Sequence, residues 1–100
     1  MDRANRLQML YAAIYDTDKK MYKIMTDILK AHLEALEKHR DDWPEDVVHM
    51  TAIMAEEAGE AVQAANNVVH EGESLEPLRQ ELAQTAAMCI RCLVNLEGRT

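Results

Sequence analysis

The sequence contains no phenylalanine and very few of the residues that interrupt helices. Its 100 residues include three glycines and two prolines. Glycine and proline disfavour helix interiors, so their scarcity argues against a fold built from many short elements joined by turns. The remaining composition is rich in Ala, Leu, Met and Glu, which are strong helix formers. We therefore predict an all-α chain with long helices and few connections.

The chain also lacks four other features that would indicate a function class. Two cysteines are too few for a dense disulfide framework, so a reducing compartment, the cytoplasm, is expected. No apolar run is long enough to predict a membrane span, and residues 1–10 lack the apolar core of a signal peptide. A net charge of −7 argues against a nucleic acid polymer as partner, because phosphate backbones attract clustered Lys and Arg.

Hydrophobic spacing organises the chain into a single domain over 1–100. Residues 1–43 contain no Gly or Pro, and their apolar residues recur at helical spacing except for a polar gap at 15–18. This gap marks either a break between two helices or one solvent-exposed turn of a continuous helix. The hydrophobic pattern is consistent with both. A connection at 71–73, with Gly72 suited to a positive φ, separates two further helices.

Capping signals place the starts of these two helices. Asp42 is a candidate N-cap, with Pro44 in the first turn and Glu45 in the capping-box position, so the second helix is predicted over about 44–70. Ser74 is the predicted cap of the third helix, with Pro77 in its first turn. That helix is predicted to continue to about residue 97.

Two acids lie on the wrong face of the second helix. On a helical wheel Glu57 falls in the middle of the apolar stripe, and Glu60 lies one turn further on and still faces inward. Carboxylates on a core face must be paired, protonated or bound to a cation. Two explanations stay open at this point, a pairing with Lys or Arg of the first helix (or a solvent gap) and a cation site.

The third helix carries a similar pair. Glu81 lies at the edge of its apolar face, and Gln84 follows one turn later. An acid pair at i and i+3 projects its oxygens in one direction, so two pairs on adjacent antiparallel helices can converge. Converging oxygens suit Mg²⁺ or Mn²⁺, which favour carboxylates and keep waters or take substrate phosphates.

Together these segments resemble a known motif. The stretch 55–60 (AEEAGE) followed by 80–84 (QELAQ) resembles the MazG-like branch of the all-α nucleoside triphosphate pyrophosphohydrolases, whose pattern is EExxE on one helix and ExxD on the next. The resemblance covers about 43–96, including the Trp at the start of the second helix. It implies a helical bundle, usually a dimer or dimer of dimers, and Mg²⁺-dependent cleavage of an NTP or dNTP to the monophosphate and pyrophosphate.

The resemblance also assigns roles to individual residues. Glu57, Glu60, Glu81 and Gln84 fall on the metal-ligand positions, and Glu56 falls on the extra acid, which would assist the ligands or position a water. We accordingly treat Glu56 and Glu57 as catalytic candidates. The family has Asp where this chain has Gln84, so the site loses one formal negative charge and Mg²⁺ affinity is expected to fall unless three Glu and the substrate phosphates hold the ion.

Polar residues on matching helix edges are the candidates for substrate binding. Arg91 follows Gln84 at the same orientation and has the forked donor group that suits phosphate, the alternative being a salt bridge to acids of the second helix. Asn95 and Asn67 would contact the sugar or base. Trp43 would either stack on a base or act as a hydrophobic staple at the helix start.

These expectations combine into an architecture and three functional hypotheses. We predict a bundle of three to four helices completed by dimerisation, because the long helices expose more apolar stripe than one thin chain covers. The leading hypothesis is a Mg²⁺-dependent nucleotide pyrophosphohydrolase acting on a nucleoside triphosphate. The alternatives are a degenerate homologue that binds a nucleotide or protein partner without turnover, and a purely structural helical dimer whose inward acids form salt bridges.

Overall fold

The computed structural model describes residues 2–17, 19–39 and 42–100, which form four α-helices and no strand. The helices are α1 (Arg3–Thr17), α2 (Lys19–Lys38), α3 (Val47–Glu71) and α4 (Glu76–Leu96). The all-α prediction is confirmed. Within the described part of the chain, none of these helices has the length and apolarity needed to cross a bilayer.

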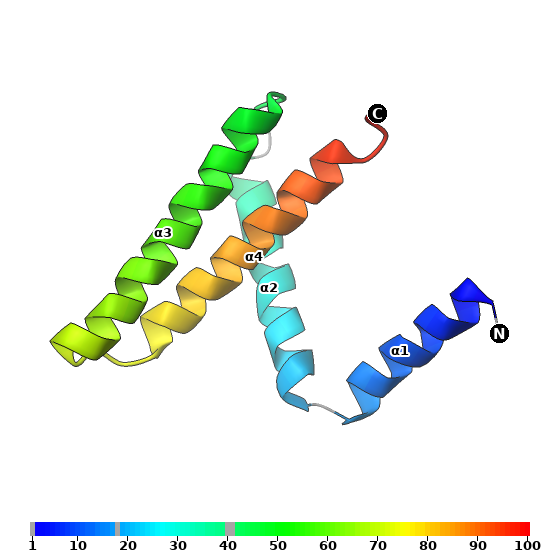
Figure 1. Cartoon of the computed structure of the whole chain (residues 1–100), viewed down its shortest axis with the longest axis horizontal. Helices are drawn as coiled ribbons and strands as arrows, with labels where there is room; N and C mark the ends of the chain where they lie inside the picture. Colours follow the sequence, from blue (N-terminus) through cyan, green and yellow to red (C-terminus); the bar gives the residue numbers. More distant parts are fainter. Residues whose placement is uncertain (1, 18, 40–41) are drawn as a thin grey trace.

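Helices α3 and α4 form an antiparallel hairpin (Figure 1). Helix α3 ends at Gly72, whose φ of 69° is left-handed and whose N–H donates to the carbonyl of Asn67. The N–H of Glu73 donates to the same carbonyl at 3.2 Å. Because a side chain disfavours this conformation, the glycine predicted at the connection is the residue that ends the helix. Pro77 lies in the first turn of α4, also as predicted.

The predicted cap residues are wrong for both helices of the hairpin. Asp46, not Asp42, caps α3, and its Oδ1 accepts the N–H of His49 at 2.8 Å. The N–H of Asp42 instead donates to the carbonyl of His39 at 3.3 Å, in the turn that follows α2. Helix α4 has Leu75 at its N-cap position and no side-chain cap, so Ser74 does not fill that role. Several capping residues occur close together here, and the path of the connecting chain decides which one caps.

The core is thin and consists mostly of alanine. Among the residues whose burial the structure describes, the buried apolar ones are Met50, Ala61 and Ala64 on α3 and Ala87 on α4. Small side chains at a helix contact allow the axes to approach closely, since interaxial distance depends on the residues between them. The alanines therefore bring α3 and α4 close together over the middle of the hairpin.

One buried cation joins α2 to this hairpin. The side chain of Arg91 on α4 is almost fully buried, with 2% of its surface exposed. Its Nη1 donates to the carbonyl of Ala35 at 3.3 Å, and its Nη2 donates to the carbonyl of His39. Its guanidinium also lies over the Trp43 ring, 4.5 Å from the ring centroid. Arg91 thus adds further donors to two carbonyls at the C-terminal end of α2, which also accept the N–H groups of His39 at 2.9 Å and Asp42 at 3.3 Å.

Helix α1 stands apart from the hairpin. Among the described residues it contacts α2 only, and Figure 1 shows it extending away from α3 and α4. The structure has two helices in this part of the chain, and α1 includes residues 15–17 of the polar gap while α2 begins at Lys19. The gap itself includes Asp18, which lies outside the described residues.

Replacing Asp46 by Ala is expected to lower the free energy of unfolding by about 1 kcal/mol, because the N–H of His49 loses its acceptor. Asp42→Ala is the matched control and is expected to change it by less than about 0.5 kcal/mol. Urea unfolding followed by circular dichroism measures both. An equal loss in the two variants would contradict the assignment of the cap.

Replacing Arg91 by Lys is expected to lower the free energy of unfolding by about 2–3 kcal/mol. Lysine keeps the charge but cannot reach both carbonyls with a planar fork while stacking on Trp43. Arg79→Lys is the control, since Arg79 is exposed and pairs only with Glu76 at 3.6 Å; its change is expected to stay below about 1 kcal/mol. Urea unfolding at one fixed protein concentration compares the free energies of unfolding of the two variants. Similar decreases in both would contradict the role of Arg91 in holding α2.

Candidate metal centre

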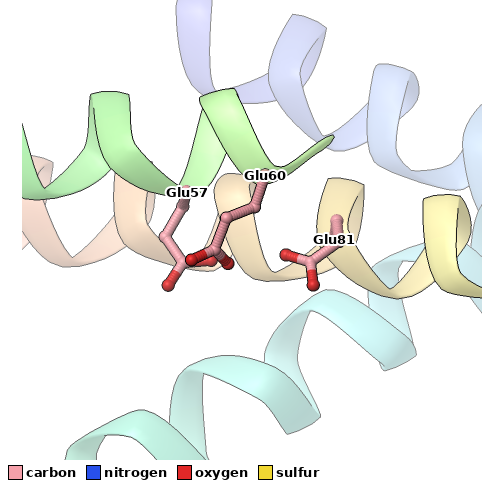
Figure 2. A group of neighbouring side chains, drawn as sticks. All are labelled: Glu57, Glu60 and Glu81. Carbon is pink, nitrogen blue, oxygen red and sulfur yellow. The ribbon is translucent and has the colours of Figure 1, made fainter. Parts of the chain in front are cut away.

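Three carboxylates from α3 and α4 converge on one point. Glu57 and Glu60 on α3 and Glu81 on α4 each contribute one oxygen, and these oxygens lie within 4.8 Å of one another. Figure 2 shows the three side chains turned to the same side of the hairpin, towards α2. The convergence predicted from the helical wheel is therefore present.

The local sequence explains this geometry. Glu57 and Glu60 are three residues apart, so they lie on one face of α3 one turn apart. The antiparallel direction of α4 brings Glu81 opposite them. Ala61 and Ala64, which follow in α3, are buried and leave room for the close approach of the second helix. Three acids from two helices thus share one small volume.

Mutual repulsion and burial both act on these acids. Burial raises the pKa of Glu57 above its ordinary value, and the nearby charges of Glu60, Glu81 and Glu56 and a hydrogen bond with Glu60 raise it further. The pKa of Glu81 is also raised, first by burial and then by the charge of Glu60 and a hydrogen bond with it. Glu57 and Glu81 therefore resist ionisation unless positive charge is added nearby.

No side chain of the described residues supplies that positive charge. The Oε2 atoms of Glu57 and Glu81 are buried and accept no hydrogen bond, and the ion pairs of the described chain involve other residues. The alternative pairing of these acids with Lys or Arg of the first helix is thus not found there. Converging carboxylate oxygens without donors fit a hard divalent cation, which takes oxygen ligands.

A groove between α2 and the hairpin opens beside the acids. It has a volume of about 270 Å³, and its walls include Glu57 and Gln84. Its walls also include Glu34 and Lys38 of α2 and His39, which directly follows that helix. Sequence reasoning missed these three residues. The only available signal was the spacing of Glu34 and Lys38, four residues apart and hence on one face of α2.

The other predicted site residues lie at different distances from the acids. Glu56 is exposed on α3 next to Glu57, and Gln84 is exposed one turn after Glu81. Asn67 accepts a hydrogen bond from Gln63 at 3.0 Å, and Asn95 donates one to the carbonyl of Arg91 at 2.8 Å. At 1.5 Å per residue, Asn95 lies about 21 Å from Glu81 along α4, and Asn67 about 10 Å from Glu60 along α3. Their contacts with sugar or base stay predictions.

Arg91 occupies a position that neither of its two predicted roles described. Its guanidinium donates to the carbonyls of α2 rather than pointing into the groove, and it forms no ion pair with the acids of α3. Because Arg91 is 2% exposed, a phosphate contact would require its guanidinium to be uncovered. Trp43 likewise has its ring face covered by this guanidinium.

Comparison with known proteins adds no family assignment. No protein-family model, curated protein or solved structure matches the chain. The resemblance to the MazG-like enzymes therefore rests on the motif spacing, to which the structure adds the convergence of Glu57, Glu60 and Glu81.

Metal binding is expected to stabilise the protein, and the effect should depend on pH. At ten times its Kd, Mg²⁺ or Mn²⁺ adds about 1.4 kcal/mol, which raises Tm by about 5 °C or more. Because the pKa values of Glu57 and Glu81 are raised above the ordinary 4.5 in the folded protein, the native state binds more protons than the unfolded one just above pH 4.5. The contribution of these acids to metal-free stability therefore falls as pH rises from 4.5 through their folded pKa values.

The measurement is a thermal melt at pH 5 and pH 7.5, with and without the metal. Glu57→Gln is expected to lose the metal-induced shift and to flatten the pH dependence, whereas Glu73→Gln, at an exposed residue of the α3–α4 connection, should behave as the parent does. An equal metal shift in the two variants would rule out the carboxylate cluster as the binding site.

Proposed function

We propose that the protein is a divalent-cation-dependent hydrolase that cleaves a nucleoside triphosphate to the monophosphate and pyrophosphate. The single observation that carries this proposal is the convergence of one oxygen each of Glu57, Glu60 and Glu81 within 4.8 Å, where the Oε2 atoms of Glu57 and Glu81 are buried without a hydrogen-bond partner. Many reactions use a divalent cation held by carboxylates. We propose this one because the order of the acids along α3 and α4 resembles that of the MazG-like enzymes.

Each residue of the cluster has a definite part in this proposal. Glu57, Glu60 and Glu81 would hold the cation, with Gln84 adding a neutral carbonyl oxygen from the groove wall. When bound there, Mg²⁺ supplies positive charge for the phosphate oxygens and lowers the pKa of a water. Holding the cation on two helices fixes its position relative to the groove, where the triphosphate would lie.

The groove walls complete the proposed site. Glu56 is exposed beside the cluster, so its carboxylate can accept a proton from the attacking water. Lys38 and His39 lie on the α2 wall of the groove that also contains Glu57, and the ammonium of Lys38 would attract phosphate oxygens. Since Arg91 is bound to α2, Lys38 is the better candidate for the phosphate contact.

The non-catalytic alternative depends on Gln84. With glutamine at this position the site has three formal charges from its ligands rather than four, which weakens cation binding. In this alternative the missing fourth charge leaves a protein that binds the cation and the nucleotide but does not hydrolyse the nucleotide. Restoring the acid, by Gln84→Asp, distinguishes a weak enzyme from a binding protein.

Pyrophosphate release from a panel of NTPs and dNTPs with Mg²⁺ or Mn²⁺ tests the proposal. The parent is expected to release pyrophosphate, and Glu57→Gln is expected to reduce the rate by more than about 10–100-fold, the loss produced even by residues that only orient metal ligands. Gln84→Asp is expected to retain or increase the rate, because it adds a charged ligand.

Glu73→Gln serves as the matched control, with the same change of charge away from the cluster. Activity that appears only in Gln84→Asp would contradict catalysis by the parent and favour the non-catalytic alternative. Absence of metal binding by calorimetry, with nucleotide present, would contradict both and leave a structural role for the acids.

A further inference from the structure

Two grooves meet on the side of α2 that faces the carboxylate cluster. The groove beside Glu57, of about 270 Å³, adjoins a larger one of about 520 Å³ between α2 and the first half of α4. The two grooves share three wall residues, Ala31 and Glu34 of α2 and Gln84 of α4. A ligand that extends from one groove into the other therefore lies beside Glu34 and Gln84.

Glu34 is the acid that α2 contributes to both grooves. It is exposed, and neither ion pair of the described residues involves it. It lies outside the group of three carboxylates whose oxygens are within 4.8 Å of one another, although Figure 2 shows those three acids turned towards α2. Glu34 and Glu57 thus line the smaller groove from different helices, and the space between them can hold a water and a phosphate group.

The position of Glu34 is held by the next residue of α2. Nη1 of the buried Arg91 donates to the carbonyl of Ala35 at 3.3 Å, which ties this turn of α2 to α4. Lys38 follows Glu34 by four residues and lines the same groove. A carboxylate and an ammonium therefore lie on one wall, about 6 Å apart along the helix axis. A phosphate group that contacts Lys38 would have a water beside Glu34 as its neighbour.

Glu56, the candidate proton acceptor of the proposed function, is placed differently. Successive residues of a helix point about 100° apart, so Glu56 diverges from the direction of Glu57. Glu56 is not among the wall residues of either groove. A general base must lie within hydrogen-bond reach of the proton that it accepts, directly or through one water. The groove walls therefore favour Glu34 for this part.

We propose that Glu34 is the general base of this site, an inference that rests on the proposed function. Glu34 accepts a proton from the attacking water as the water oxygen forms a bond to the α-phosphorus of the nucleoside triphosphate. The bond between that phosphorus and the oxygen bridging to the β-phosphorus breaks, and its electron pair leaves with pyrophosphate. The proton then passes from Glu34 to solvent. The reaction thus uses a residue of α2, which precedes the segment that resembles the MazG-like enzymes.

Steady-state kinetics and calorimetry of Glu34→Gln test the proposal. The kcat for pyrophosphate release is expected to fall by about 10²–10⁴-fold with KM nearly unchanged, because the variant lacks the proton acceptor but keeps the groove. Calorimetry with Mn²⁺, and then with Mn²⁺ and nucleotide, is expected to give the Kd values of the parent. Glu37→Gln is the matched control, at an exposed residue of α2 that lines neither groove, and is expected to keep the parent rate.

Chemical rescue separates proton acceptance from a structural role. Formate is a small carboxylate that fits the space vacated in Glu34→Ala, so it is expected to restore part of the lost rate. A lost rate that formate does not restore, or a loss of Mn²⁺ binding in Glu34→Gln, would overturn the proposal. A large loss of kcat in Glu56→Gln alone would assign the proton to Glu56.

The same measurements separate this proposal from the proposed function. A parent that releases no pyrophosphate from any nucleotide contradicts the proposed function and the role of Glu34 with it. An active parent whose Glu34→Gln variant keeps the full kcat contradicts the role of Glu34 alone.

Discussion

The arrangement of this protein depends on one buried guanidinium. Arg91 lies on α4, binds the carbonyls of Ala35 and His39 at the end of α2, and stacks on Trp43 in the connection that follows. One side chain of α4 thus holds the end of α2 and the connection after it, which are distant from α4 in sequence. Ala35 and His39 also line the groove beside Glu57. The residue that fixes α2 therefore also sets the position of the wall that faces the carboxylates.

The carboxylates depend on a second constraint, the small residues of the hairpin. Ala61 and Ala64 on α3 and Ala87 on α4 are buried and provide little apolar area for their number. Larger residues there would bury more surface but would move the helices apart and separate Glu81 from Glu57 and Glu60. The close approach that forms the carboxylate cluster therefore comes with a small apolar core. The raised pKa values of Glu57 and Glu81 show that burial and mutual repulsion disfavour their charged forms.

The parts of this structure that could be predicted from the sequence are those determined along one helix. Helical periodicity indicated the helices, and Gly72 indicated the left-handed end of α3. The helical wheel indicated the convergence of Glu57 and Glu60, although Glu60 is exposed rather than facing the core. The choice of Asp46 over Asp42 as cap could not be predicted, because both are good caps and the connection decides between them. The role of Arg91 and the groove residues Glu34, Lys38 and His39 required knowing how α2 crosses α4. That crossing depends on contacts between distant segments, which one sequence does not reveal.

The isolation of α1 has a consequence for how the chain folds. Its 15 residues contact only α2 among the described helices, and a helix of that length is marginal in water without packing. We therefore expect its backbone hydrogen bonds to open at a lower free-energy cost than those of the α3–α4 hairpin, which the buried alanines and Arg91 protect. The chain accordingly consists of a stable α3–α4 hairpin and an N-terminal helix whose helix content depends on how much of its surface is packed against other protein.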